Sequence, residues 1–197
     1  MSAVTYLLAC VPAATAAIGW ATSARRAVCL RRHALTDRLT GLANREALAA
    51  QLRVVAGTAP AVGVLMLDLD AFKRVNDRYG HDEGNRVLRH VADQLRSVAL
   101  PRELPARLHG DEFALLLGAL PSGSAGRRTA AARVSAIRRA IAEPLVTDTA
   151  CHSVTASVGA AVLPARGADL GALLALADAS MYRAKPGRDS RRATTFA

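Results

Sequence analysis

Few aromatic residues and few cysteines narrow the classes to which this 197-residue sequence can belong. Phe, Trp and Tyr make up 4% of the chain. Basic residues therefore lack the interleaved stacking side chains that single-stranded nucleic acid binding uses, and we expect no nucleic acid partner. The three cysteines form no CxxC pair, which excludes a disulfide framework and a zinc site of the usual spacing. Apolar residues make up 51%, too many for a disordered chain.

Lysine is also scarce, because only Lys73 and Lys185 are present and arginine supplies nearly all of the formal charge of +10. Basic charge gathers after the first 24 residues and again near the C-terminus. Such charge suits anionic lipid or a phosphate-rich ligand. The length suits one domain with a short appendage, and no internal repeat is visible.

The first 24 residues carry no charged side chain, and four arginines follow at positions 25, 26, 31 and 32. An apolar segment of this length can span a bilayer, and the flanking positive charge marks its cytoplasmic end. We therefore expect a membrane helix at 1–24 and a short juxtamembrane helix at 25–36. The protein would cross the inner (cytoplasmic) membrane once, with its main domain in the cytoplasm. One alternative is a packed helix in a cytoplasmic protein. A signal peptide fits less well, because no basic region precedes the apolar segment.

The rest of the chain predicts the element order α-β-α-β-β-α-β-α. The run AVGVLMLDLD at 61–70 is apolar on both faces until its aspartates, as in a central strand covered by helices on both sides. Residues 71–81 are predicted to be a connector, and RLHGDEFALLL at 107–117 a hairpin that turns at His109-Gly110. A mixed sheet with helices on its faces follows.

Two pairs of carboxylates stand where strands end. Asp68 and Asp70 close one buried strand, and Asp111 and Glu112 lie in the hairpin. Residues two apart on a strand share a face, and carboxylates that converge from two strands suit Mg²⁺, which fills its other positions with water and phosphate oxygens. Two such ions can promote phosphoryl transfer. The alternative is that these acids cap helices or pair with the many arginines.

Polar residues after Asp70 suit a nucleotide. If a helical turn begins at Ala71-Phe72-Lys73, its free N–H groups attract phosphate, and Lys73 or Lys185 adds a positive charge. Asn76 and Asn85 carry both the donors and the acceptors that recognition of a base requires. The alternatives are surface lysines and asparagines that serve turns or caps.

Several motifs in one order identify a family resemblance. They are DRLTGLANR (37–45), LMLDLDAFKRVNDRYGHDEGNRVL (65–88), RLHGDEF (107–113), SVG (157–159) and ADASMYRAK (177–185). Together they resemble the GGDEF-domain diguanylate cyclases over about residues 36–190. The resemblance implies a GGDEF domain at 37–190 and a basic tail at 191–197. It also implies a palm-like α/β (α+β) fold with a central mixed, mainly antiparallel sheet flanked by helices, related to adenylyl cyclases and polymerases.

The resemblance further implies a reaction in which two GTP molecules form cyclic di-GMP across a homodimer, with two Mg²⁺ or Mn²⁺ ions per half-site. Metal ligands would be Asp68, the carbonyl of Leu69 and Asp111, with Glu112 assisting metal binding or activation of the 3′-hydroxyl. The remaining implied roles concern substrate: Phe72, Lys73 and Lys185 at the phosphates, Asn76 and Asn85 at guanine, and Gly110 allowing close approach of the nucleotide.

Departures from the family pattern leave alternatives open. His109 replaces the first glycine of the signature; we expect it to leave the metal ligands untouched and to affect only how closely a nucleotide approaches. Asn85 replaces an aspartate that accepts two N–H bonds from guanine. The ending Lys185-Pro-Gly-Arg188-Asp is one residue short, which puts the role of Arg188 in doubt, and LPRE at 100–103 replaces the inhibitory RxxD motif. The chain could therefore be an inactive module that binds GTP or a protein partner, or an enzyme that makes a mixed adenine–guanine dinucleotide.

Overall fold

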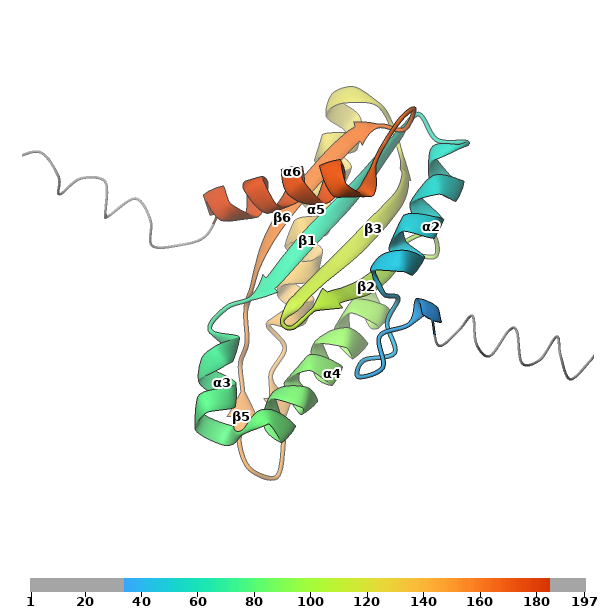
Figure 1. The fold of residues 1–197 in the computed structure, drawn as a ribbon. Helices are drawn as coiled ribbons and strands as arrows, with labels where there is room; N and C mark the ends of the chain where they lie inside the picture. The colour runs from blue at the N-terminus through green and yellow to red at the C-terminus, as the bar shows by residue number, and fades with distance from the viewer. Residues whose placement is uncertain (1–33, 185–197) are drawn as a thin grey trace, which may run out of the picture. The chain divides into compact units, whose positions relative to one another are not determined.

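The computed structural model describes residues 34–184 (Figure 1). The chain divides into two compact units, residues 1–36 and 37–197, and the fold described here is that of the second unit. The predicted membrane helix at 1–24, nearly all of the juxtamembrane helix at 25–36, Lys185, Arg188 and the tail at 191–197 lie outside the described residues. Within residues 34–184 no helix is long and apolar enough to cross a bilayer.

Four strands form the main sheet: β1 (Ala61–Leu69), β2 (Leu104–His109), β3 (Glu112–Leu120) and β6 (Ala156–Pro164). Their spatial order is β2-β3-β1-β6, and every neighbouring pair is antiparallel. With the intervening helices this is the split β-α-β-β-α-β arrangement. β1 is central and buried along nearly its whole length, which explains its unbroken apolar sequence. The predicted α/β fold with a mainly antiparallel sheet is confirmed.

Helices cover both faces of this sheet (Figure 1). Because side chains alternate along a strand, Leu65 and Leu67 face the core shared with α4 (His81–Val98) and α5 (Gly123–Ile141). Val64 and Met66 face the opposite core, shared with α2 (Arg45–Ala56) and α6 (Leu170–Ala184). Asp68 follows Val64 and Met66 on this second face and is the first residue of the series that is not apolar. The end of β1 therefore presents a carboxylate at the rim of the α2–α6 layer.

Two local predictions were wrong or incomplete. The predicted connector at 71–81 contains α3 (Phe72–Tyr79), which is joined to α4 by Gly80 alone. Its apolar residues Phe72, Val75 and Tyr79 do recur at helical spacing, but the helix has only 8 residues, its mean hydropathy is low and only Phe72 is buried. The segment is thus shorter than the window over which helical periodicity is usually read. A small hairpin, β4 (Leu145–Val146) with β5 (Cys151–His152), was also missed, since two-residue strands are too short to show alternation.

Candidate active site

The end of β1 and the β2–β3 turn place four predicted site residues together. Asp68 and Glu112 are directly paired across the two strands, so their side chains share the α2–α6 face. The amide N–H of Leu69 donates to the Asp111 carbonyl at 3.3 Å. The three carboxylates are half-buried. Two strands that are far apart in sequence thus bring Asp68, Leu69, Asp111 and Glu112 into one corner.

Arg107, which the sequence analysis passed over, holds the turn. Its guanidinium donates two hydrogen bonds to the Gly110 carbonyl, at 2.9 and 2.7 Å, and two longer ones to the Asp37 carboxylate, at 3.1 and 3.3 Å. Gly110 has a left-handed φ of +48°, and a Cβ there would meet no atom within 4 Å. Arg107 therefore holds the turn through the Gly110 carbonyl, while the space on the Cβ side of Gly110 is open. Only its position two residues before His109 could have drawn attention to Arg107.

Asp37 anchors this arginine from the beginning of the domain. Its carboxylate also accepts hydrogen bonds from the Thr40 amide at 2.9 Å and from the Thr40 hydroxyl at 2.6 Å. Burial acts to raise the pKa of Asp37, but the bonds from Thr40 and Arg107 outweigh it and lower the pKa below its usual value. The carboxylate therefore stays ionised, as a partner for Arg107 requires.

His109 contacts one member of the acidic set, a contact that the sequence analysis did not predict. Its Nε2 lies 3.1 Å from Oε2 of Glu112. The strand register shifts between Arg107 and His109, so that His109 rather than its neighbour stands opposite Glu112; such a bulge re-aims side chains next to a turn. The imidazole is mostly exposed and Glu112 largely covered. Any ligand that binds the Glu112 carboxylate would therefore also contact His109.

Asp70 has a different role from Asp68, although the two end the same strand. Its carboxylate accepts hydrogen bonds from the hydroxyls of Thr155 and Ser157, both at 2.6 Å. Its amide donates to the Thr155 carbonyl at 2.8 Å. Asp70 thus ties the exit of β1 to the start of β6 and keeps the Asp68 backbone in place.

The turn after Asp70 leads into the predicted phosphate and base contacts. Ala71 adopts a left-handed φ of +57°, after which α3 begins at Phe72. The Phe72 side chain is buried in the core, which leaves its backbone as the group available to a ligand, whereas Lys73 is exposed. A positive φ in a non-glycine residue carries strain that is commonly kept where a ligand binds.

Asn76 and Asn85 come from different helices that pack closely. A Cβ on Gly84 would lie 1.9 Å from Oδ1 of Asn76 and 3.2 Å from the Phe72 ring. The Asn76 side chain therefore lies directly against α4 where Gly84 leaves room, and Asn85 is the next residue of that helix. Both asparagines are half-buried. The two asparagines predicted to bind the base thus both belong to the α3–α4 corner.

The donor set at the carboxylates fits Mg²⁺ or Mn²⁺. Asp68, Asp111 and the Leu69 carbonyl are hard oxygen donors, and Mg²⁺ binds through one or two carboxylates while substrate phosphates and water complete its shell. Within the described part of the chain, no three His, Cys, Asp or Glu side chains form a ready cluster. Any ion bound by these groups would therefore need further ligands, such as water or phosphate oxygens, to complete its shell.

Glu103, in the segment that replaces RxxD, already has hydrogen-bond partners within the domain. Two guanidinium nitrogens of Arg133 donate to the Glu103 carboxylate at 2.7 Å each, and the Leu100 amide donates to it at 2.9 Å. The Glu103 side chain is only 3% exposed. It is therefore unable to bind a ligand without breaking a buried ion pair.

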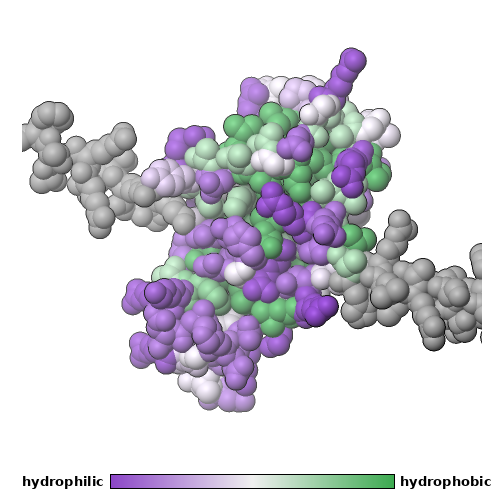
Figure 2. All heavy atoms as spheres, in the orientation of Figure 1, coloured by the Kyte–Doolittle hydropathy of each residue, from purple (hydrophilic) through white to green (hydrophobic). Residues whose placement is uncertain are grey.

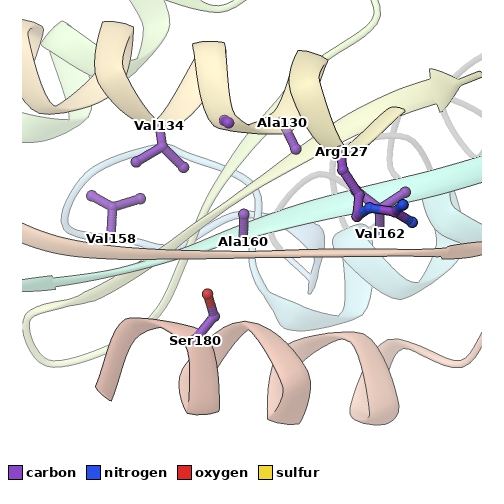
Figure 3. Close-up of a pocket in the computed structure, with 8 residues that line it drawn as sticks. Arg127, Ala130, Val134, Val158, Ala160, Val162 and Ser180 are labelled. Atoms are coloured by element: carbon purple, nitrogen blue, oxygen red, sulfur yellow. The ribbon is translucent and has the colours of Figure 1, made fainter. Parts of the chain in front are cut away.

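A separate groove runs between α5 and the β6 strand (Figure 3). Its volume is about 340 Å³, and Val134 faces Val158 across it. Arg127 closes one end, and Ser180 of α6 lies on the other side of β6. None of the lining residues belongs to the carboxylate corner or to the α3–α4 corner, so the groove is distinct from the candidate active site.

Comparison with known proteins finds a matching family model and several similar proteins. A family model described as "Diguanylate cyclase, GGDEF domain" matches residues 34–191. Diguanylate cyclase TpbB of Pseudomonas aeruginosa is 37% identical over 168 residues, which cover 83% of this chain and 38% of TpbB. Cyclic di-GMP phosphodiesterase PdeR of Escherichia coli is 39% identical, covering 80% of this chain and 23% of PdeR. The chain thus spans less than two fifths of the length of these relatives.

Among solved structures, the coiled coil and GGDEF domain of DgcB from Caulobacter crescentus, in complex with c-di-GMP, matches with a TM-score of 0.72. The two sequences are 29% identical, and the match covers 95% of each chain.

Proposed function

The chain belongs to the GGDEF-domain family of diguanylate cyclases, and from this premise we propose that it condenses two GTP molecules into cyclic di-GMP. The observation that carries the proposal is the strand pairing of Asp68 with Glu112, together with the bond between Leu69 and Asp111. These contacts support the proposal because they put the ends of two strands that carry oxygen donors next to each other, and Lys73 follows in the first turn of α3.

Each domain would hold one GTP. Asp68, Asp111 and the Leu69 carbonyl would hold two divalent ions with the help of Glu112, and the ions supply charge neutralisation and a more acidic 3′-hydroxyl. The Phe72 backbone and the side chains of Lys73 and Lys185 bind the triphosphate, with Gly110 leaving room for it. Asn76 and Asn85 bind the base.

In the reaction, the 3′-hydroxyl oxygen of each GTP attacks the α-phosphate of the other. Each attack forms one P–O bond and expels pyrophosphate. The two new bonds close the ring of cyclic di-GMP. Because the reacting groups belong to two domains, catalysis requires a homodimer at least transiently.

Membrane attachment by residues 1–24 stays a prediction, and under the proposal it would favour dimer formation by raising the local concentration of domains. Cell fractionation tests it: the intact protein should sediment with membranes and a version starting at residue 33 should not. Equal distribution of the two would contradict the anchor.

The proposal is tested with purified protein, GTP and Mg²⁺ by following cyclic di-GMP and pyrophosphate. Asp111→Ala should remove product formation while leaving the fold intact. The matched control is Asp93→Ala, which removes an exposed carboxylate that pairs only with Arg96 on the same helix. Full activity of the Asp111 variant would refute the assigned role.

A second function, binding of GTP or a partner without turnover, is favoured by one observation. The 3.1 Å contact between His109 and Glu112 engages a carboxylate that the reaction needs. His109→Gly discriminates between the two functions. A wild-type protein that binds GTP as a dimer without product, and gains activity on this substitution, would establish the regulatory function and identify the histidine as the block.

A further inference from the structure

Glu83 and His152 form a buried acid–histidine pair away from the carboxylate corner. Oε1 of Glu83 lies 2.8 Å from Nε2 of His152, and the two side chains are 5% and 4% exposed. Glu83 is in the first turn of α4, and His152 is on β5. The pair therefore joins the start of α4 to the small β4–β5 hairpin.

Further contacts fix both members. The Thr147 hydroxyl donates to Oε1 of Glu83 at 2.6 Å, and Arg86 donates to Oε2 at 2.9 Å. The ring of Tyr79, the last residue of α3, meets the His152 ring edge to face at 5.1 Å. Three elements, α3, α4 and the hairpin, thus converge on this pair.

The position of the pair ties it to the predicted base contacts. Glu83 directly precedes Gly84 and Asn85, and Asn76 lies against Gly84. In Figure 1 the β5 segment lies beside α3 and the start of α4, at one end of the domain. The same end is covered mainly by hydrophilic side chains in the view of Figure 2. A displacement of the hairpin would therefore shift the corner that carries both asparagines.

Burying a carboxylate is costly unless it is hydrogen-bonded, and an apolar pair of similar volume is often at least as stable. Satisfied polar networks instead favour one arrangement of the groups they join. We propose that Glu83 and His152 are positioning residues that hold the α3–α4 corner so that Asn76 and Asn85 face the nucleotide base. The inference rests on the proposed function, because that function assigns the asparagines to guanine.

Two variants of the full chain test the positioning role. Glu83→Gln removes the charge, and the double variant Glu83→Met with His152→Phe replaces the network by an apolar pair of similar size. The matched control is His90→Phe, since His90 is also on α4 but contacts the Glu143 carbonyl instead. Binding of GTP, ATP and inorganic tripolyphosphate is measured by calorimetry in Mg²⁺, with thermal unfolding recorded for each protein.

We expect affinity for GTP to fall about ten- to a hundredfold in both variants, the loss expected when one or two hydrogen bonds to the base are broken. The preference for GTP over ATP should shrink accordingly. Affinity for tripolyphosphate should be unchanged, because the start of α3 next to Lys73 has its own attachments. Phe72 is buried in the core, and Asp70 is bonded to Thr155 and Ser157. In turnover, KM for GTP should rise while kcat at saturation is retained. The His90 variant should behave as wild type.

Unchanged GTP affinity in the folded double variant would overturn the positioning role. So would an equal loss of affinity for GTP and tripolyphosphate, which indicates general disruption, or a wild-type protein with no preference for GTP. Failure of the cyclase proposal can be distinguished from failure of the positioning role. Even if the wild-type protein forms no cyclic di-GMP, its preference for GTP over ATP can still be measured by binding.

Discussion

Gly84→Ala should separate the stability of this domain from the proposed recognition of guanine by Asn76. In the substituted protein the new Cβ would lie 1.9 Å from Oδ1 of Asn76, whereas real Cβ contacts essentially never fall below 3.0 Å. The amide must therefore retreat by at least 1.1 Å. Hydrogen bonds tolerate a range of only about 0.5 Å between donor and acceptor, so Asn76 should lose its contact with the base.

The effect on stability is a balance of opposing contributions. Alanine favours an α-helix over glycine by about 1 kcal/mol. Overpacking costs about 1–3 kcal/mol, and a flexible amide that rotates away keeps the cost near the lower end. We therefore expect the free energy of unfolding to fall by only about 0–2 kcal/mol. The loss of one hydrogen bond should raise KM for GTP about three- to tenfold.

The measurements are chemical unfolding and steady-state kinetics with GTP. Gly57→Ala is the control, because its Cβ would find only ordinary contacts at 3.5 and 3.8 Å; it should be neutral or slightly stabilising. Asn76→Ala combined with Gly84→Ala removes the clash, so the double variant should be more stable than Gly84→Ala and bind GTP no worse than Asn76→Ala. A Gly84→Ala protein with wild-type KM would refute the reasoning.

Three further predictions follow from the described contacts. Arg107→Lys should lower the free energy of unfolding by about 1–3 kcal/mol, because one ammonium cannot bridge Asp37 and the Gly110 carbonyl as a guanidinium does; unfolding in denaturant that matches wild type would contradict this. The Thr147 hydrogen bond, opposed by burial and supported by His152, lowers the pKa of Glu83 to about 2. Its contribution to stability is therefore present above pH 4.5 and lost as pH falls from there toward 2, so Glu83→Gln should flatten the loss of thermal stability in this interval, and an unchanged pH profile would count against it. Asn85→Asp should raise the ratio of kcat/KM for GTP to that for ATP, since a carboxylate accepts two N–H bonds where an amide has one acceptor oxygen; a lower ratio would exclude Asn85 from the base site.

Much of the fold was predictable because its signals are local. The apolar run of β1, the turn at Gly110 and the periodicity of α4 each lie within a few residues of sequence, and each predicted the element that the structure contains. The family motifs are also local in sequence, and they were enough to predict Asp68 and Asp111 as site residues. Polar α3 was missed because a helix of 8 residues with low mean hydropathy and one buried residue offers only a very short apolar pattern.

The sequence by itself thus determined most of the elements, though not α3 or the β4–β5 hairpin, and which carboxylates stand at the strand ends. Only the tertiary structure decided what each polar group contacts, because these contacts join residues far apart in sequence: 70 positions for Asp37 and Arg107, 69 for Glu83 and His152, and 87 for Asp70 and Ser157. Such contacts depend on strand register, and a slip of one residue turns every side chain to the other face. The bulge that brings His109 to Glu112 is the sharpest example, since a regular hairpin would have placed its neighbour there.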